Sequence, residues 1–194
     1  MTKTALLSLD MINELLHPDG KFAAFGYPQE ARRRGTIDRA ATALARARAQ
    51  GIPVMHVAIG FSPDYAEGTT VSPLLGQAPQ YGSLQLGTWA TEFLDEVAPE
   101  SGEPVIVKHR VSAFYNTDLE LRLRALGIER VLLMGCSTDL VVQATAREAH
   151  DRDFIVEILA DATSSESPEL HESGLAVLRH ITTVTTVDEA LPAV

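Results

Sequence analysis

Short apolar runs alternate with longer amphipathic stretches along the chain, and this alternation constrains the fold more than any other feature. Six runs are expected to form strands: residues 5–10, 53–59, 103–108, 130–135, 154–161 and 182–187. Helical patterns are expected at residues 29–51, 116–128 and 167–181, and in the stretch after Thr138. Strands that alternate with helices in this way favour a parallel sheet with helices on both faces. We therefore predict a three-layer α/β/α fold with a mainly parallel six-stranded sheet.

No composition break, repeat or linker divides the sequence, so residues 1–194 are expected to form a single domain. The 26 acidic and 16 basic residues give a net charge of −10, which opposes binding to nucleic acid or to an anionic membrane surface. No apolar run is long enough to span a bilayer, and the first residues lack the pattern of a secretory signal. A cytoplasmic location is expected.

Chemistry in such folds gathers at the carboxyl ends of the strands. Asp10 ends the first predicted strand and Lys108 ends the third, while the one cysteine, Cys136, follows the fourth. A carboxylate at the rim of a sheet suits acid–base chemistry, and a nearby lysine suits electrostatic stabilisation. Position alone also allows Asp10 to be a loop residue, Lys108 to point to solvent and Cys136 to be a small buried side chain. The histidines show no metal-ligand spacing, and neither a metal nor a cofactor is predicted.

Three ordered segments resemble the isochorismatase-like hydrolase superfamily, which includes cysteine amidases and true isochorismatases. They read LLSLDMINELL from residue 6, VIVKHRVSAFYNTDLELRLRALGI from residue 105, and VLLMGCSTDLVVQATAREAHD from residue 131. The resemblance implies that Asp10 is a catalytic acid or base and that Lys108 is its electrostatic partner.

The same resemblance assigns the nucleophile's position. Cysteine hydrolases of this kind read Gly-x-x-Thr-x-x-Cys-Val, and here Gly135, Thr138 and Val142 take the matching places. The nucleophile's place therefore falls on Val141, which has no thiol. Cys136 and Ser137 take the turn positions, where the family often has a cis peptide bond that aims backbone amides at the substrate.

Substrate selection is less defined. The resemblance places Ile59 where isochorismatases have a glutamine, and residues 57–107 contain no Lys or Arg, so the dianion isochorismate is expected to be a poor substrate. The absence of an Asp-x-His pattern at residues 59–61 also argues against a nicotinamidase metal site. Pocket candidates are Ile59, Phe61, Tyr65, Tyr81, Leu86, Trp89, Phe114 and Thr138, although aromatic residues of this kind also occur in cores and subunit interfaces.

Three functions remain open. The first is a hydrolase of a small, mostly neutral or singly charged molecule that uses Asp10 and Lys108 without a thiol. The second is a non-catalytic binding or assembly subunit. The third is a cysteine amidase that uses Cys136 in an unusual geometry. A small-molecule substrate and a homodimer or homotetramer are the expected partners.

Overall fold

The computed structural model describes residues 2–193. Six strands form one sheet in the order β3-β2-β1-β4-β5-β6, and every neighbouring pair of these strands is parallel. The strands are β1 (Thr4–Leu9), β2 (Val54–Ile59), β3 (Val105–Lys108), β4 (Arg130–Cys136), β5 (Ile155–Ser164) and β6 (Thr183–Thr185). The predicted fold class is confirmed.

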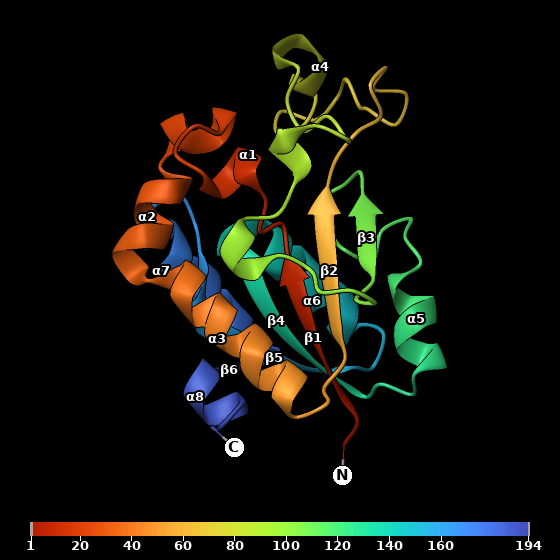
Figure 1. Cartoon of the computed structure of the whole chain (residues 1–194), viewed down its shortest axis with the longest axis vertical. Helices are drawn as coiled ribbons and strands as arrows, with labels where there is room; N and C mark the ends of the chain where they lie inside the picture. The colour runs from red at the N-terminus through yellow and green to blue at the C-terminus, as the bar shows by residue number, and fades with distance from the viewer. Residues whose placement is uncertain (1, 194) are drawn as a thin grey trace.

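Helices cover both faces of the sheet (Figure 1). The α-helices are α1 (Asn13–Leu16), α2 (Tyr27–Arg34), α3 (Thr36–Ala49), α4 (Ala78–Tyr81), α5 (Leu119–Ala125), α6 (Gln143–His150), α7 (Pro168–Leu178) and α8 (Val187–Ala190). Short 3-10 segments are η1 (Lys21–Phe25), η2 (Trp89–Thr91) and η3 (Asp95–Val97), and η4 (Thr138–Val142) is a π-helical turn that leads into α6.

Each face of the sheet has its own apolar core. One core packs α5, α6 and α7 against the sheet through residues such as Leu123, Ala146 and Leu175. The other packs α2, α3 and α8 through residues such as Leu44 and Val187. This arrangement is the three-layer architecture that buries both faces of a parallel sheet.

The predicted helix over residues 29–51 is two helices. Gly35 separates α2 from α3 with a φ of 66°, a left-handed conformation that glycine adopts at little cost. Ala31 and the three arginines before Gly35 favour a helix, and an amphipathic run follows Gly35, which is why the sequence pattern alone predicts one helix. Most of residues 60–88 is irregular, with α4 as a single helical turn within it.

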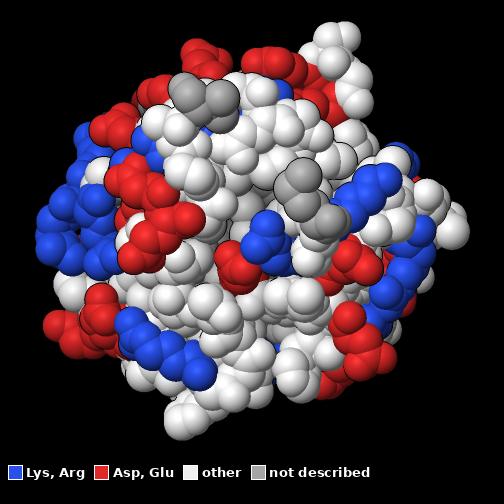
Figure 2. Space-filling model, turned by 90° about the horizontal axis from the view of Figure 1, so that it is seen from below, with Lys and Arg blue, Asp and Glu red and all other residues white. Residues whose placement is uncertain are grey.

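The two ends of the sheet differ. The chain termini lie at the amino ends of the central strands, whereas α1, α4 and the irregular segments lie beyond the carboxyl ends (Figure 1). Figure 2 shows the end with the termini, where acidic and basic side chains are interspersed. Several basic groups at this end are paired, for example Arg46 with Asp188 at 2.6 Å and Arg130 with Glu157 at 3.1 Å.

β4 approaches β1 closely near their carboxyl ends. Gly135 lies opposite Leu9 in the register, and a Cβ at position 135 would overlap the carbonyl oxygen of Leu9. Gly135 also has a φ of 131°, which disfavours any residue with a side chain. The absence of a side chain at 135 therefore permits the strands to bring residues 10 and 136 next to each other.

Candidate active site

Asp10 follows β1 directly and is held by two hydrogen bonds with the neighbouring strand β2. Its backbone N–H donates to the carbonyl of Val57 at 2.8 Å, and its Oδ1 accepts a hydrogen bond from the N–H of Ile59 at 2.7 Å. Its φ is 53°, which is unusual for a residue other than glycine and occurs often at functional sites. The strand and its neighbour thus fix both the backbone and the carboxylate of Asp10.

Lys108, at the end of β3, reaches the same carboxylate. Its Nζ lies 2.7 Å from Oδ2 of Asp10 and also donates to the carbonyl of Arg110 at 3.1 Å. Both side chains of the pair are buried. The expected ion pair between Asp10 and Lys108 is therefore present.

Burial raises the pKa of Asp10 above the usual carboxyl range, while the charge of Lys108 and the N–H of Ile59 act in the opposite direction. The three influences together bring a carboxylate closer to the range in which it exchanges a proton near neutral pH. Such a group can act as a general acid or base.

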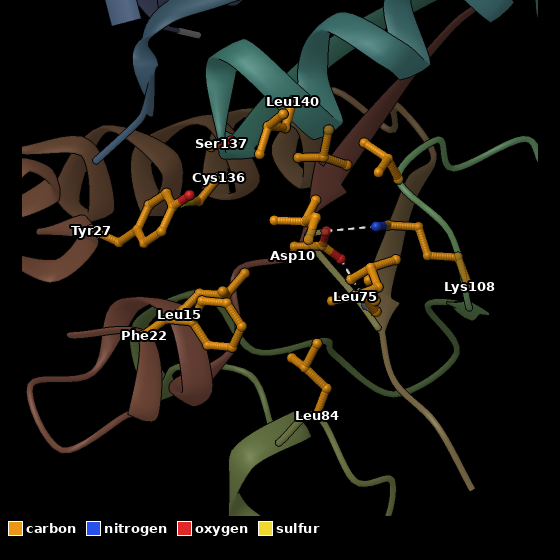
Figure 3. A pocket seen from close by; sticks show the side chains of 14 residues that line it. Asp10, Leu15, Phe22, Tyr27, Leu75, Leu84, Lys108, Cys136, Ser137 and Leu140 are labelled. Carbon is orange, nitrogen blue, oxygen red and sulfur yellow. Dashed lines mark hydrogen bonds and ion pairs between the residues drawn. The ribbon is translucent and has the colours of Figure 1, made fainter. Parts of the chain in front are cut away.

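The pair borders an inner cavity of about 60 Å³ at the carboxyl ends of four adjacent strands (Figure 3). The cavity is lined by Asp10, Leu15, Phe22, Tyr27, Ile59, Leu74, Leu75, Leu84, Lys108, Val111, Cys136, Ser137, Leu140 and Val141. Among these, Asp10 and Lys108 are the charged members, and nearly all the others are apolar. The wall combines one ion pair with a largely apolar surface.

Val141 lines this cavity from η4, on the polypeptide turn that follows β4. It therefore shares a cavity with Asp10 and Lys108, as the position of a nucleophile requires. The turn is anchored below the cavity: Thr138 Oγ1 lies 2.8 Å from Nδ1 of the buried His171, and Ser165 Oγ donates to Asp139 at 2.6 Å.

Cys136 and Ser137 also line the cavity, and the peptide bond between them is cis. The Cys136 side chain is buried. Burial, together with the negative charges of Asp10 and Asp139, raises the pKa of its thiol well above the usual cysteine value. The thiol of Cys136 is therefore protonated at neutral pH, which makes it a poor nucleophile.

Seven of the eight predicted pocket residues lie outside the lining of this cavity. Tyr65, Tyr81 and Leu86 are three of them, and the other four have partners elsewhere in the structure. Phe61 is fully buried and contacts the rings of Tyr65 and His109. Trp89 is 44% exposed and meets the ring of His17 edge-on. The partners His109 and His17 lie far from Phe61 and Trp89 along the chain, so no local sequence pattern predicts where these two rings pack.

The remaining two belong to the scaffold. Phe114 packs against Phe154 in the core beneath α5 and α6, with the guanidinium of Arg152 over its ring. Thr138 directs its hydroxyl to His171. Ile59 is the member of the predicted apolar set that lines the inner cavity.

Sequence reasoning missed the other wall of the cavity. Phe22 and Tyr27 come from η1 and from the start of α2, and Figure 3 shows them across the cavity from Lys108. Residues 17–27 carry no strand or helix periodicity. The one local sequence signal for Tyr27 is its place beside Pro28 at the start of a helix.

Within residues 2–193, no group of three or more His, Cys, Asp or Glu side chains is arranged to hold a metal ion. The helices in this part of the chain are also too short or too polar to cross a bilayer.

Comparison with known proteins assigns the family. The Isochorismatase domain model matches residues 4–189. The chain belongs to the isochorismatase family. Its members include small-molecule hydrolases, and the fold described above is that of an isochorismatase-like α/β domain.

Several relatives resemble the whole domain. Ureidoacrylate amidohydrolase RutB of Methylorubrum extorquens is 35% identical over 192 residues, which cover 93% of this chain and 76% of the relative. The isochorismatase family protein from Desulfovibrio vulgaris subsp. vulgaris str. Hildenborough is 28% identical, with a TM-score of 0.87 over 100% of each chain. N-carbamoylsarcosine amidase from Thermoplasma acidophilum is 30% identical, with a TM-score of 0.76 over 96% of this chain and 98% of the other.

Proposed function

We propose that this isochorismatase-family protein hydrolyses a small, neutral or singly charged molecule without a thiol nucleophile. The observation that carries the proposal is the buried pair of Asp10 and Lys108 on the wall of a cavity, 2.7 Å apart. Buried ion pairs contribute little to stability relative to apolar residues of the same size. A pair that faces a cavity therefore has a better explanation in chemistry than in folding.

In this mechanism a water molecule attacks the electrophilic carbon of the substrate while Asp10 accepts the proton of the water. The tetrahedral adduct then breaks its bond to the leaving group, and Asp10 returns the proton to that group. The ammonium group of Lys108 stabilises the anionic form of Asp10. Val141 adds no bond to the substrate and forms an apolar wall beside the reacting atoms.

The class of bond follows from the relatives. Ureidoacrylate amidohydrolase and N-carbamoylsarcosine amidase are named for cleavage of amide-type C–N bonds. We infer that this chain acts on a similar bond, in a substrate with less charge than isochorismate, since Lys108 is the cation of the inner cavity and is already paired.

The test compares wild-type protein with Asp10→Asn on ureidoacrylate, N-carbamoylsarcosine and a set of neutral primary amides. Release of ammonia is measured, with Asp95→Asn as a matched control because Asp95 is an exposed aspartate on η3. General acid–base catalysis contributes about 10²–10⁴-fold, so Asp10→Asn is expected to lose at least about 100-fold while the control keeps full activity. Equal activity of Asp10→Asn and wild type would contradict the proposal.

A non-catalytic binding subunit is the second candidate, and the valine at position 141 favours it. It is distinguished by the same panel: binding of the compounds without any turnover by wild type would support it. The cytoplasmic location and the homodimer or homotetramer remain predictions.

A further inference from the structure

A second, much larger chamber adjoins the inner cavity. It has a volume of about 690 Å³, more than ten times that of the inner cavity. The two spaces share four lining residues, Phe22, Tyr27, Leu74 and Leu84. These four side chains thus form a collar between an inner cavity with the Asp10–Lys108 pair and an outer chamber.

The outer chamber lies between η1 and residues 73–84, and polar contacts tie these two walls together. Lys21 Nζ donates to the carbonyl of Gly82 at 2.5 Å and lies 3.9 Å from Glu14. The carboxylate of Glu14, which is buried, accepts a hydrogen bond from the N–H of Leu84 at 3.1 Å. The chamber is therefore a built feature of the fold with its walls held at a fixed separation.

The lining of the outer chamber is predominantly apolar and carries little net charge. Its charged members among the described residues are Lys21, which has the partners named above, and Glu166. Two aromatic side chains on its rim, Phe25 and Tyr81, are 62% and 61% exposed. Aromatic groups exposed around a concave space are typical of a surface that binds an apolar ligand.

We infer that the outer chamber binds the apolar arm of the substrate while the polar head of the same molecule lies beside Asp10. An inner cavity of about 60 Å³ accommodates only a head of a few heavy atoms. Because the four collar residues border both spaces, one molecule can place its head in the inner cavity and its arm in the outer chamber. The ligand class is a neutral, elongated molecule with a small carbonyl-containing head and a hydrophobic or aromatic arm. This inference rests on the proposed function, because it names the substrate of that site.

Binding and turnover are tested separately. Methyl ketones carry the carbonyl head but have no hydrolysable bond, so 2-butanone, 2-pentanone, 2-heptanone and 4-phenyl-2-butanone serve as probes of wild-type protein. Affinity, measured by calorimetry or ligand-observed NMR, is expected to rise about threefold to fourfold for each added methylene that becomes buried.

Two variants locate the arm. Phe25→Ala removes part of the chamber wall, and Ala24→Trp fills part of the space. Both are expected to weaken 4-phenyl-2-butanone at least about fivefold and to leave 2-butanone unchanged. Leu121→Ala is the matched control, since Leu121 is an exposed apolar residue on α5 outside the chamber lining.

Affinity that does not change with arm length, or that is unaffected by both chamber variants, would overturn the inference. A dimer in sedimentation equilibrium that Phe25→Ala converts to monomer, together with a flat ketone series, would assign the surface to a second copy of the chain instead. Primary amides with the same arms test turnover: ketones that bind by arm length beside amides that are not hydrolysed would refute the proposed function and leave the binding site standing. If amides were hydrolysed equally well whatever their arm, the proposed function would stand and the assignment of the outer chamber to the arm would be refuted.

Discussion

The carboxylate of Asp10 and the ammonium of Lys108 form a buried ion pair, with 2.7 Å between Oδ2 and Nζ, on the wall of a cavity lined mainly by apolar side chains. Removal of both charges from water costs free energy that the attraction between them only partly offsets. Each buried charge is therefore stabilised by its partner, and this coupling can be measured as a change in the free energy of unfolding.

The first prediction concerns stability. Asp10→Asn and Lys108→Met each leave one buried charge without its partner, so each is expected to lower the free energy of unfolding by about 3–5 kcal/mol. Asparagine tolerates the left-handed backbone of position 10, which keeps the comparison free of backbone strain. The double variant is expected to be more stable than either single variant. Urea unfolding of the four proteins gives the coupling.

The exposed pair of Asp118 and Arg122 on neighbouring turns provides the control for this cycle. Its coupling is expected to be much smaller than that of the buried pair, since water screens both groups. If the losses at positions 10 and 108 simply added, the two charges would not depend on each other.

The second prediction concerns thiol reactivity. Burial and nearby negative charge raise the pKa of Cys136, so wild-type protein is expected to react slowly with iodoacetamide near pH 7 and faster only in alkaline solution. In Cys136→Ser/Val141→Cys, the new thiol lies in the cavity with Lys108, whose positive charge favours thiolate. We expect fast alkylation near neutral pH in that variant alone.

Cys136→Ser is the control, because it retains Asp10 and Lys108 and is expected to keep whatever hydrolytic activity wild type has. Fast neutral alkylation of wild-type Cys136 with loss of that activity would instead support the cysteine amidase.

The third prediction concerns acid stability through His171. Burial, and then the charge of Arg34, lower the pKa of this imidazole to about 4. The unfolded chain, with an ordinary histidine pKa near 6.5, therefore binds the proton first as the pH falls. The free energy of unfolding is expected to drop between about pH 6.5 and pH 4, by up to about 3 kcal/mol from this residue.

His171→Asn removes that dependence while it keeps a polar group toward Thr138. His150→Asn is the matched control, because His150 is exposed on α6. Denaturant unfolding between pH 4 and pH 7 gives the slopes, and a slope for His171→Asn equal to that of wild type would contradict the assignment. His56, whose pKa burial also lowers, contributes a slope of the same sign in all three proteins.

The fourth prediction concerns isochorismate. Two carboxylates on a substrate require cationic or hydrogen-bonding partners, and the inner cavity offers Lys108, which Asp10 already neutralises. We expect pyruvate release from isochorismate at least about 100-fold less efficient than turnover of the best neutral substrate, a gap of about 2.7 kcal/mol in transition-state binding. Coupled lactate dehydrogenase assays measure it, and efficient release would refute the proposed substrate class.

The sequence predicted the parts of this structure that local patterns encode. Asp10 and Lys108 end apolar runs, and the rule that parallel strands place their carboxyl ends together is enough to bring both to one edge. The helix break at Gly35 was missed because residues that favour a helix lie on both sides of it. Tyr27 and Phe22 were missed for another reason: their place on the cavity wall depends on how η1 folds over the sheet, which no spacing within residues 17–27 reports.

Phe114 and Trp89 illustrate the same limit, because they were predicted to line the pocket and do not. An aromatic residue in a loop looks alike in sequence whether it lines a cavity, packs in a core or lies on the surface. Only the partners decide, and here these are Phe154 and His17, 40 and 72 residues away along the chain.

The contact between Gly135 and Leu9 separates the architecture of this site from its reagent. Because β4 can touch β1 there, the turn that carries Val141 lies beside Asp10, and the polar side chains that anchor this turn are those of Thr138 and Asp139. A substitution at 141 is therefore expected to change the chemistry of the cavity while the frame around it stays the same. The frame itself tolerates no such exchange at 135, because any side chain there would overlap the carbonyl oxygen of Leu9.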